Sequence, residues 1–222
     1  MTTAQDQSIA HAVTNDHNQF WATYDEYVKN AGNVDAQTRW SNQLTWEIAR
    51  HAISEELAIY PLFEKHLGER GQKMADQDRE EHQEVKEKLF DLDNMTPGSE
   101  EHAALLKVII DRLKTHAHSE ETHDLPALES ALSGSQNMDA AKSFNTTKKF
   151  VPTRYRSLSG YVSGERWLKC PGLRPHPKAP NKPPFETLVG MLTAPVDKLR
   201  DSFRQYPSVE EVESITHAGP IN

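Results

Sequence analysis

The chain has 222 residues, a formal net charge of −8 at pH 7 and a single cysteine, Cys170. A mean hydropathy of −0.74 without a long apolar run excludes a transmembrane helix, and the acidic balance argues against nucleic-acid or anionic-membrane partners. One thiol permits neither an internal disulfide nor a multi-thiolate metal site, so we expect a reducing, cytoplasmic location and metal chemistry only from the 11 histidines and the carboxylates.

Four long helices are predicted from hydrophobic periodicity and from the Gly and Pro residues between them. The first covers about residues 8–31, and the second covers 35–67 and ends at Gly68. The third covers 72–92 and the fourth 99–133, with Ser99 as its N-cap. Long helices joined by short loops pack as antiparallel neighbours. The predicted fold is therefore all-α, an up-down-up-down four-helix bundle over residues 1–134.

The remaining residues, 135–222, are predicted to form a C-terminal extension. A short helix is expected over 138–150, and further helical pieces at 186–192 and 196–203. Prolines exclude regular helix or central strand between these elements. They are Pro152, Pro171, Pro175, Pro177, Pro180, Pro183 and Pro184. We interpret this Pro-rich segment as a strap lying over the bundle.

One internal repeat carries the chemistry of the chain. Residues 51–61 read HAISEELAIYP and residues 116–126 read HAHSEETHDLP, identical at six of 11 aligned positions. In each copy a glutamate follows a histidine by four residues, which places Glu55 beside His51 and Glu120 beside His116 on one helix face. The second and fourth helices of such a bundle are parallel and diagonal. Both motifs can therefore face each other across the core.

The other two helices each supply one core-facing histidine, His17 and His82. Four imidazoles and two carboxylates suit two divalent ions, because carboxylates bridge metals and imidazole is a terminal ligand for iron, zinc or copper. Alternatives are that His11 replaces His17, and that Asp78 or Glu81 also reaches a metal. A single His-x-x-x-Glu motif is usually a solvated face. The duplicated motif favours metal, because buried imidazoles and carboxylates without a partner are costly.

These motifs resemble the hemerythrin-like, or HHE cation-binding, family over residues 16–126. Segments 44–51, 148–154, 176–177 and 183–187 are similar to its fungal branch. Ferritin-type sites and zinc proteases fit poorly, because they use Glu-x-x-His and His-Glu-x-x-His. The resemblance implies two irons joined by an oxo or hydroxo group. It implies bridging by Glu55 and Glu120, and terminal ligation by His17, His51, His82 and His116.

The chain departs from the oxygen carriers of that family at three places. The carriers have a second histidine on the third helix, where Asp78 stands here, so one iron has a more open ligand set and reversible oxygen carriage is doubtful. Their second carboxylate follows its histidine by five residues, which is Glu121 here. Glu120 is preferred because it matches the first repeat, and Glu121 is the alternative. Residues 155–174 interrupt the similarity and are predicted to be an insertion.

The resemblance implies a non-haem di-iron protein that binds dioxygen, peroxide or nitric oxide, or iron itself, for sensing, transport or detoxification. The alternative is a di-iron oxidoreductase or oxygenase acting on a small molecule, for which the sequence identifies neither substrate nor electron donor. A metal-free helical scaffold for a protein partner is a third hypothesis. Zinc or manganese can substitute for iron in a histidine-rich site.

Overall fold

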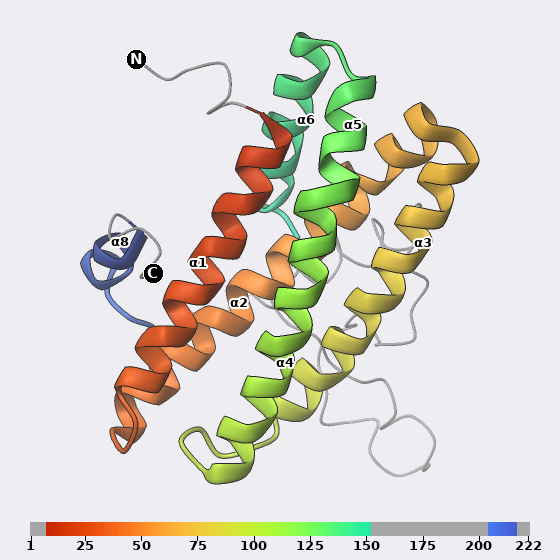
Figure 1. Cartoon of the computed structure of the whole chain (residues 1–222). Helices are drawn as coiled ribbons and strands as arrows, with labels where there is room; N and C mark the ends of the chain where they lie inside the picture. The colour runs from red at the N-terminus through yellow and green to blue at the C-terminus, as the bar shows by residue number, and fades with distance from the viewer. Residues whose placement is uncertain (1–7, 152–203, 217–222) are drawn as a thin grey trace, which may run out of the picture.

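The computed structural model describes residues 8–151 and 204–216, and the regular structure within these ranges is entirely helical (Figure 1). The all-α prediction is confirmed. The helices are α1 (Ile9–Lys29), α2 (Val34–Ala58), α3 (Tyr60–Leu92), α4 (Glu100–Ser119), the π-helical turn η2 (Glu120–Asp124), α5 (Leu125–Ala131), α6 (Gly134–Thr147) and α8 (Val209–Thr216). The Pro-rich strap, the helices at 186–192 and 196–203 and the insertion at 155–174 lie outside the described residues. None of the described helices has the length and apolar character needed to cross a membrane.

Side-chain caps fix where several of these helices begin. Ser8, Asn33 and Ser99 each accept a hydrogen bond from the backbone N–H three residues later. Ser133 and Gln136 form a reciprocal capping box at the start of α6. Such caps satisfy N–H groups that have no partner within the helix, which is why short polar residues precede each apolar stripe.

The boundary between the second and third helices differs from the predicted one. The helix ends at Ala58 rather than 67, because Pro61 has no N–H to donate and Ile59 is distorted to φ −106° and ψ −51°. The break expected at Gly68 is present inside α3, where φ is 59° and ψ is −136°. A glycine tolerates this positive φ without the steric penalty that a Cβ would bring.

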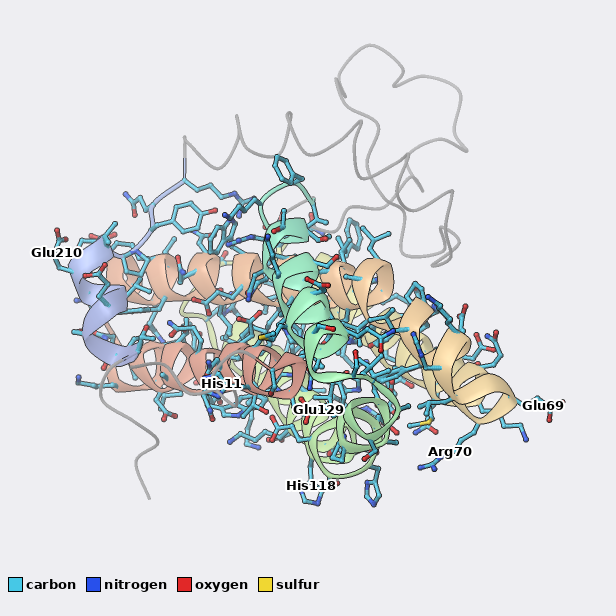
Figure 2. All side chains as sticks on the ribbon, turned by 90° about the horizontal axis from the view of Figure 1, so that it is seen from above. His11, Glu69, Arg70, His118, Glu129 and Glu210 are labelled. Atoms are coloured by element: carbon cyan, nitrogen blue, oxygen red, sulfur yellow. The ribbon has the colours of Figure 1, made fainter. Side chains whose placement is uncertain are left out.

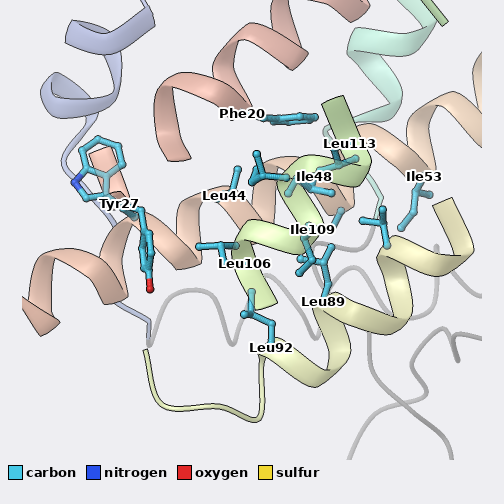
Figure 3. Packing of buried hydrophobic residues seen from close by; sticks show 14 of the residues in the cluster. Phe20, Tyr27, Leu44, Ile48, Ile53, Leu89, Leu92, Leu106, Ile109 and Leu113 are labelled. Carbon is cyan, nitrogen blue, oxygen red and sulfur yellow. The ribbon is translucent and has the colours of Figure 1, made fainter. Parts of the chain in front are cut away.

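The four long helices enclose the core. α1 packs on α2, α2 on α3, α3 on α4 and α4 on α1. The four long helices alternate in direction, and the chain reverses between α2 and the main part of α3 at Gly68 (Figure 1). One apolar cluster fills the end of this arrangement nearest the α1–α2 turn, with Phe20, Leu44, Leu89 and Ile109 among its buried members (Figure 3). Burying one side chain of this size stabilises the fold by roughly 1.5–3 kcal/mol.

A second apolar cluster lies toward the other end and includes Ile9, Tyr60, Phe63, Leu125 and Phe144. Phe144 comes from α6, which packs against both α1 and α2. The helix predicted over 138–150 is therefore present and forms part of the second core. Along each long helix, core-facing positions between the two clusters hold buried polar residues, such as His17, Glu55, His82 and His116.

Candidate metal centre

The structure brings the six preferred ligand residues together between the two apolar clusters. Each is at most 4% exposed. This inner set consists of His17, His51, Glu55, His82, His116 and Glu120. His11, the alternative to His17, is half-buried six residues earlier, and His118 projects from the outer side of α4 (Figure 2).

The four imidazoles form two close pairs. Nε2 of His17 is 3.1 Å from Nε2 of His51, and Nε2 of His82 is 3.1 Å from Nε2 of His116. Glu55 lies between the pairs, with Oε1 3.1 Å from Nε2 of His51 and Oε2 3.4 Å from Nε2 of His82. The site thus has a His17–His51 half and a His82–His116 half, joined by one carboxylate.

Glu120 joins the same two halves from the opposite diagonal helix. Its Oε2 atom is 3.8 Å from Nε2 of His17 and 3.9 Å from Nε2 of His116. Glu120 is the first residue of the π-helical turn η2, in which the N–H of Leu125 donates to the carbonyl of Glu120. Pro126 follows in the first turn of α5, as Pro61 follows in α3. Both copies of the repeat therefore interrupt regular α-helix just beyond the site.

Every imidazole is held from outside by a second carboxylate on its Nδ1 atom. The four pairs are Glu121 with His17 at 2.7 Å, Asp16 with His51 at 3.1 Å, Glu56 with His82 at 3.1 Å and Glu81 with His116 at 2.8 Å. A carboxylate only accepts hydrogen bonds, so each Nδ1 is a protonated nitrogen, and in the neutral ring Nε2 presents its lone pair to the centre. This is the tautomer that a metal ligand requires.

Two of these outer carboxylates are bound in turn by lysines. Nζ of Lys148, just past α6, lies 2.7 Å from both carboxylate oxygens of Asp16. Nζ of Lys86 lies 2.6 Å from Oε1 of Glu56, and both of these side chains are buried. Asp16 and Glu56 are therefore each held between an imidazole and a lysine.

Burial and charge act in opposite directions on the inner set. Burial would raise the pKa of Glu55, but the charge of His51 outweighs it and holds this pKa at about 2. Burial would lower the pKa of His51, but Glu55 and Asp16 raise it to about 9. Burial raises the pKa of Glu120 well above its usual value, and the nearby charge of Glu55 raises it further. Without a cation, His51 and Glu55 form an ion pair, and the carboxyl group of Glu120 favours its protonated form.

The donor set fits a pair of metal ions. None of the described residues makes a hydrogen bond to either carboxylate oxygen of Glu55 or Glu120, although all four oxygens are buried. Buried polar atoms without partners are rare in folded proteins. The 3.1 Å between paired Nε2 atoms is also close to the ~3.0 Å that separates two ligands at right angles on an ion about 2.1 Å from each.

Comparison with known proteins gives the family. The sequence matches the family described as Hemerythrin HHE cation binding domain over residues 8–128, which is more than half of the chain. The chain belongs to this family. An uncharacterized hemerythrin-like protein of Schizosaccharomyces pombe is 42% identical over 199 residues, which cover 90% of this chain and 88% of that relative. No solved structure matches the sequence.

The hemerythrin HHE domain thus carries a cluster of candidate metal ligands, and the structure separates the alternatives by position. Glu121 and Glu81 lie on the outer nitrogens of His17 and His116, not between the imidazole pairs. Asp78 is buried at the outer edge of the His82–His116 half, with Oδ1 3.9 Å from Nδ1 of His116. Burial raises the pKa of Asp78 to about 7, against the opposing charge of His116.

Sequence reasoning missed the outer role of all four carboxylates and did not single out Glu56 at all. A signal was present, because each outer carboxylate is the immediate neighbour of an inner residue. The four pairs of adjacent residues, each with one inner ligand and one outer carboxylate, are Asp16-His17, Glu55-Glu56, Glu81-His82 and Glu120-Glu121.

One small cavity adjoins the centre in this HHE domain. It measures about 30 Å³, lies between α3 and α4, and has His82 and His116 among its lining residues. A larger cavity of about 400 Å³ is lined by residues such as Ser41, Met95 and Arg204, and by no member of the inner set. The cavity next to the candidate ligands is therefore large enough for a water molecule or a diatomic molecule.

Proposed function

We propose that this protein holds a non-haem di-iron centre at the middle of an antiparallel, up-down-up-down four-helix bundle. One observation carries the proposal. Two imidazole pairs are joined by two buried carboxylates whose oxygens accept no hydrogen bond from the described residues. The proposed ligands are His17, His51, His82 and His116 at the ends of the centre, with Glu55 and Glu120 across it.

The residues of the chain prepare this site in three ways. The outer carboxylates hold each imidazole in the tautomer that presents Nε2 inward. The apolar clusters on either side exclude bulk water and so strengthen electrostatic interactions within the site. The two inner carboxylates carry two negative charges, fewer than the positive charges of two divalent ions, which leaves a net charge that favours a small anionic ligand.

Iron, when bound, would supply open coordination positions and a change of oxidation state. The proposed function is binding of dioxygen, peroxide or nitric oxide for sensing, transport or detoxification. The size of the adjoining cavity, about 30 Å³, favours such ligands over the organic substrate of an oxygenase.

The test is metal content per chain together with the ultraviolet-visible spectrum, in air and after reduction. The wild-type protein should hold about two irons and show oxo-bridge charge-transfer bands. Glu55→Gln should lose both. The matched control is Glu47→Gln, which changes another buried glutamate of α2 that bonds Gln43 and Thr23 outside the centre. Folded wild-type protein that retains no stoichiometric metal would overturn the proposal.

A further inference from the structure

We propose that external ligands reach the centre through the cavity between α3 and α4 and bind at the His82–His116 half. This inference rests on the proposed di-iron centre. It gives a role in ligand access to residues at the rim of the cavity that are not proposed metal ligands. The path runs from exposed Arg112, Glu84 and Thr115 at the surface to buried His82 and His116 at its floor.

The opposite half of the centre is covered by aromatic rings. The ring of Phe20 lies 5.0 Å from that of His51 and 6.0 Å from that of His17. Phe144, delivered by α6, meets His51 edge-on with ring centroids 5.6 Å apart. Both phenylalanines are at most 1% exposed. Because α6 packs on α1 and α2, it covers the His17–His51 half where these two helices meet.

On the His82–His116 half, the ring of Tyr60 covers His82, with centroids 5.6 Å apart. Among the described residues, His116 has a ring contact with His82 alone, and the cavity lies beside it. Val85 is the buried apolar wall of this cavity. Asp78 is not among the residues that line the cavity, whereas Glu81, which bonds Nδ1 of His116, is. The two halves of the centre therefore differ in access, although their donor atoms are arranged alike.

The dimensions of the cavity set the class of ligand. A volume of about 30 Å³ holds one or two water-sized groups. Diatomic molecules, peroxide and slender anions such as azide match this space. Part of the rim is an exposed ion pair, in which Nε of Arg112 donates to Glu84 at 3.0 Å. Exposed pairs of this kind are weak, so the rim opens at little free-energy cost.

Stopped-flow azide binding to the iron-loaded protein tests the path. Thr115→Trp places an indole at the rim and should slow both association and dissociation by about tenfold or more, which equals an added barrier of about 1.4 kcal/mol. The equilibrium Kd should stay unchanged, because a rim residue does not touch the bound ligand. Thr38→Trp is the matched control. Thr38, like Thr115, donates its hydroxyl to the carbonyl four residues earlier, but it lies away from the centre.

A second variant widens the entrance to the cavity instead of narrowing it. Arg112→Ala shortens the rim and should accelerate the binding of nitric oxide, an uncharged ligand whose rate does not depend on removal of the arginine charge. Unchanged rates in both Thr115→Trp and Arg112→Ala, with normal iron content, would overturn the path while leaving the di-iron centre in place. Loss of iron from wild-type protein would instead refute the centre itself, so the two failures are distinguishable.

Discussion

In the metal-free protein, Glu55 and Glu120 experience opposite electrostatic environments. Oε1 of Glu55 lies 3.1 Å from Nε2 of His51, and the shifted pKa values of about 2 and 9 make this contact an ion pair at neutral pH. Glu120 lies 3.8 Å or more from the imidazoles, and the charge of Glu55 disfavours its ionisation. Replacement of each by glutamine, which has nearly the same shape, should therefore change stability in opposite directions.

Glu55→Gln should destabilise the metal-free protein by about 3 kcal/mol, because the buried imidazolium of His51 loses one of its two carboxylates and keeps only Asp16. Glu120→Gln should stabilise the metal-free protein by about 1–3 kcal/mol at neutral pH, because the amide cannot ionise, whereas burial and the charge of Glu55 raise the pKa of Glu120 and so disfavour its carboxylate. With iron present, both variants should lose the stabilisation that metal binding gives to wild-type protein, about 4 kcal/mol when free metal exceeds the Kd a thousandfold.

The pH dependence follows from the direction of each shift. The folded-state pKa of Glu55 is depressed from 4.5 to about 2, so its stabilising contribution is present above pH 4.5 and is lost as pH falls toward 2. The folded-state pKa of Glu120 is raised, so wild-type protein loses stability as pH rises above 4.5. The gain in free energy of unfolding from Glu120→Gln should therefore be largest at neutral pH and vanish near pH 4.5. Urea unfolding of chelator-treated protein at several pH values measures both. If both substitutions change the free energy of unfolding of the metal-free protein in the same direction, the reasoning is refuted.

Three further predictions concern residues outside the inner set. Lys148→Met should weaken metal affinity by up to about tenfold in chelator competition, because Asp16 loses the cation that fixes it, and Lys148→Arg should retain most of the affinity. Burial lowers the pKa of His102 to about 4, so wild-type protein should lose stability as pH falls from 6.5 to 4, by at most about 1.4 kcal/mol per pH unit. His102→Gln should lack this component in urea unfolding, and equal slopes would contradict it. Gly71→Ala should cost about 3 kcal/mol or more in thermal unfolding, because a Cβ there meets a backbone carbonyl oxygen at 1.9 Å. Gly134→Ala, with no described atom within 4 Å of its Cβ, should be neutral or stabilising by up to about 1 kcal/mol.

Sequence periodicity was sufficient to find the helices and to gather the inner set. His51 with Glu55 and His116 with Glu120 obey an i, i+4 rule that depends on one helix alone. Helix interruptions were harder to place. The helix breaks at Ile59, two residues before Pro61. The proline therefore predicts that a break occurs, but not the residue at which it begins. The π-helical turn at Glu120, which precedes a second proline, likewise has no periodic signature of its own.

The outer carboxylates could not be assigned from one helix, because their partners lie on another. Glu121 and Glu81 were considered as ligands since both are acidic and adjacent to the inner set. Which nitrogen of which imidazole they meet is decided by the rotation of each helix about its own axis. The contribution of Lys148 is a longer-range case, because it requires α6 to fold back onto α1 and α2.

The outer carboxylates nevertheless follow a rule that the helix directions explain. Each bonds the imidazole of the next helix around the ring, from α1 to α2, α2 to α3, α3 to α4 and η2 back to α1. On α1 and α3 the outer carboxylate precedes its inner neighbour, whereas on α2 and η2 it follows.

Successive residues of a right-handed helix are rotated by about 100°, and reversing the helix direction reverses the sense of that rotation seen from one end of the bundle. Carboxylates that all point the same way around a ring of alternately directed helices must therefore alternate between the preceding and the following position. The order acid-His, Glu-acid, acid-His, Glu-acid along the chain is thus what consecutive antiparallel helices require if every imidazole is to be held by its neighbour. Parallel placement of any one helix would turn its outer carboxylate toward the wrong neighbour and leave one imidazole unheld.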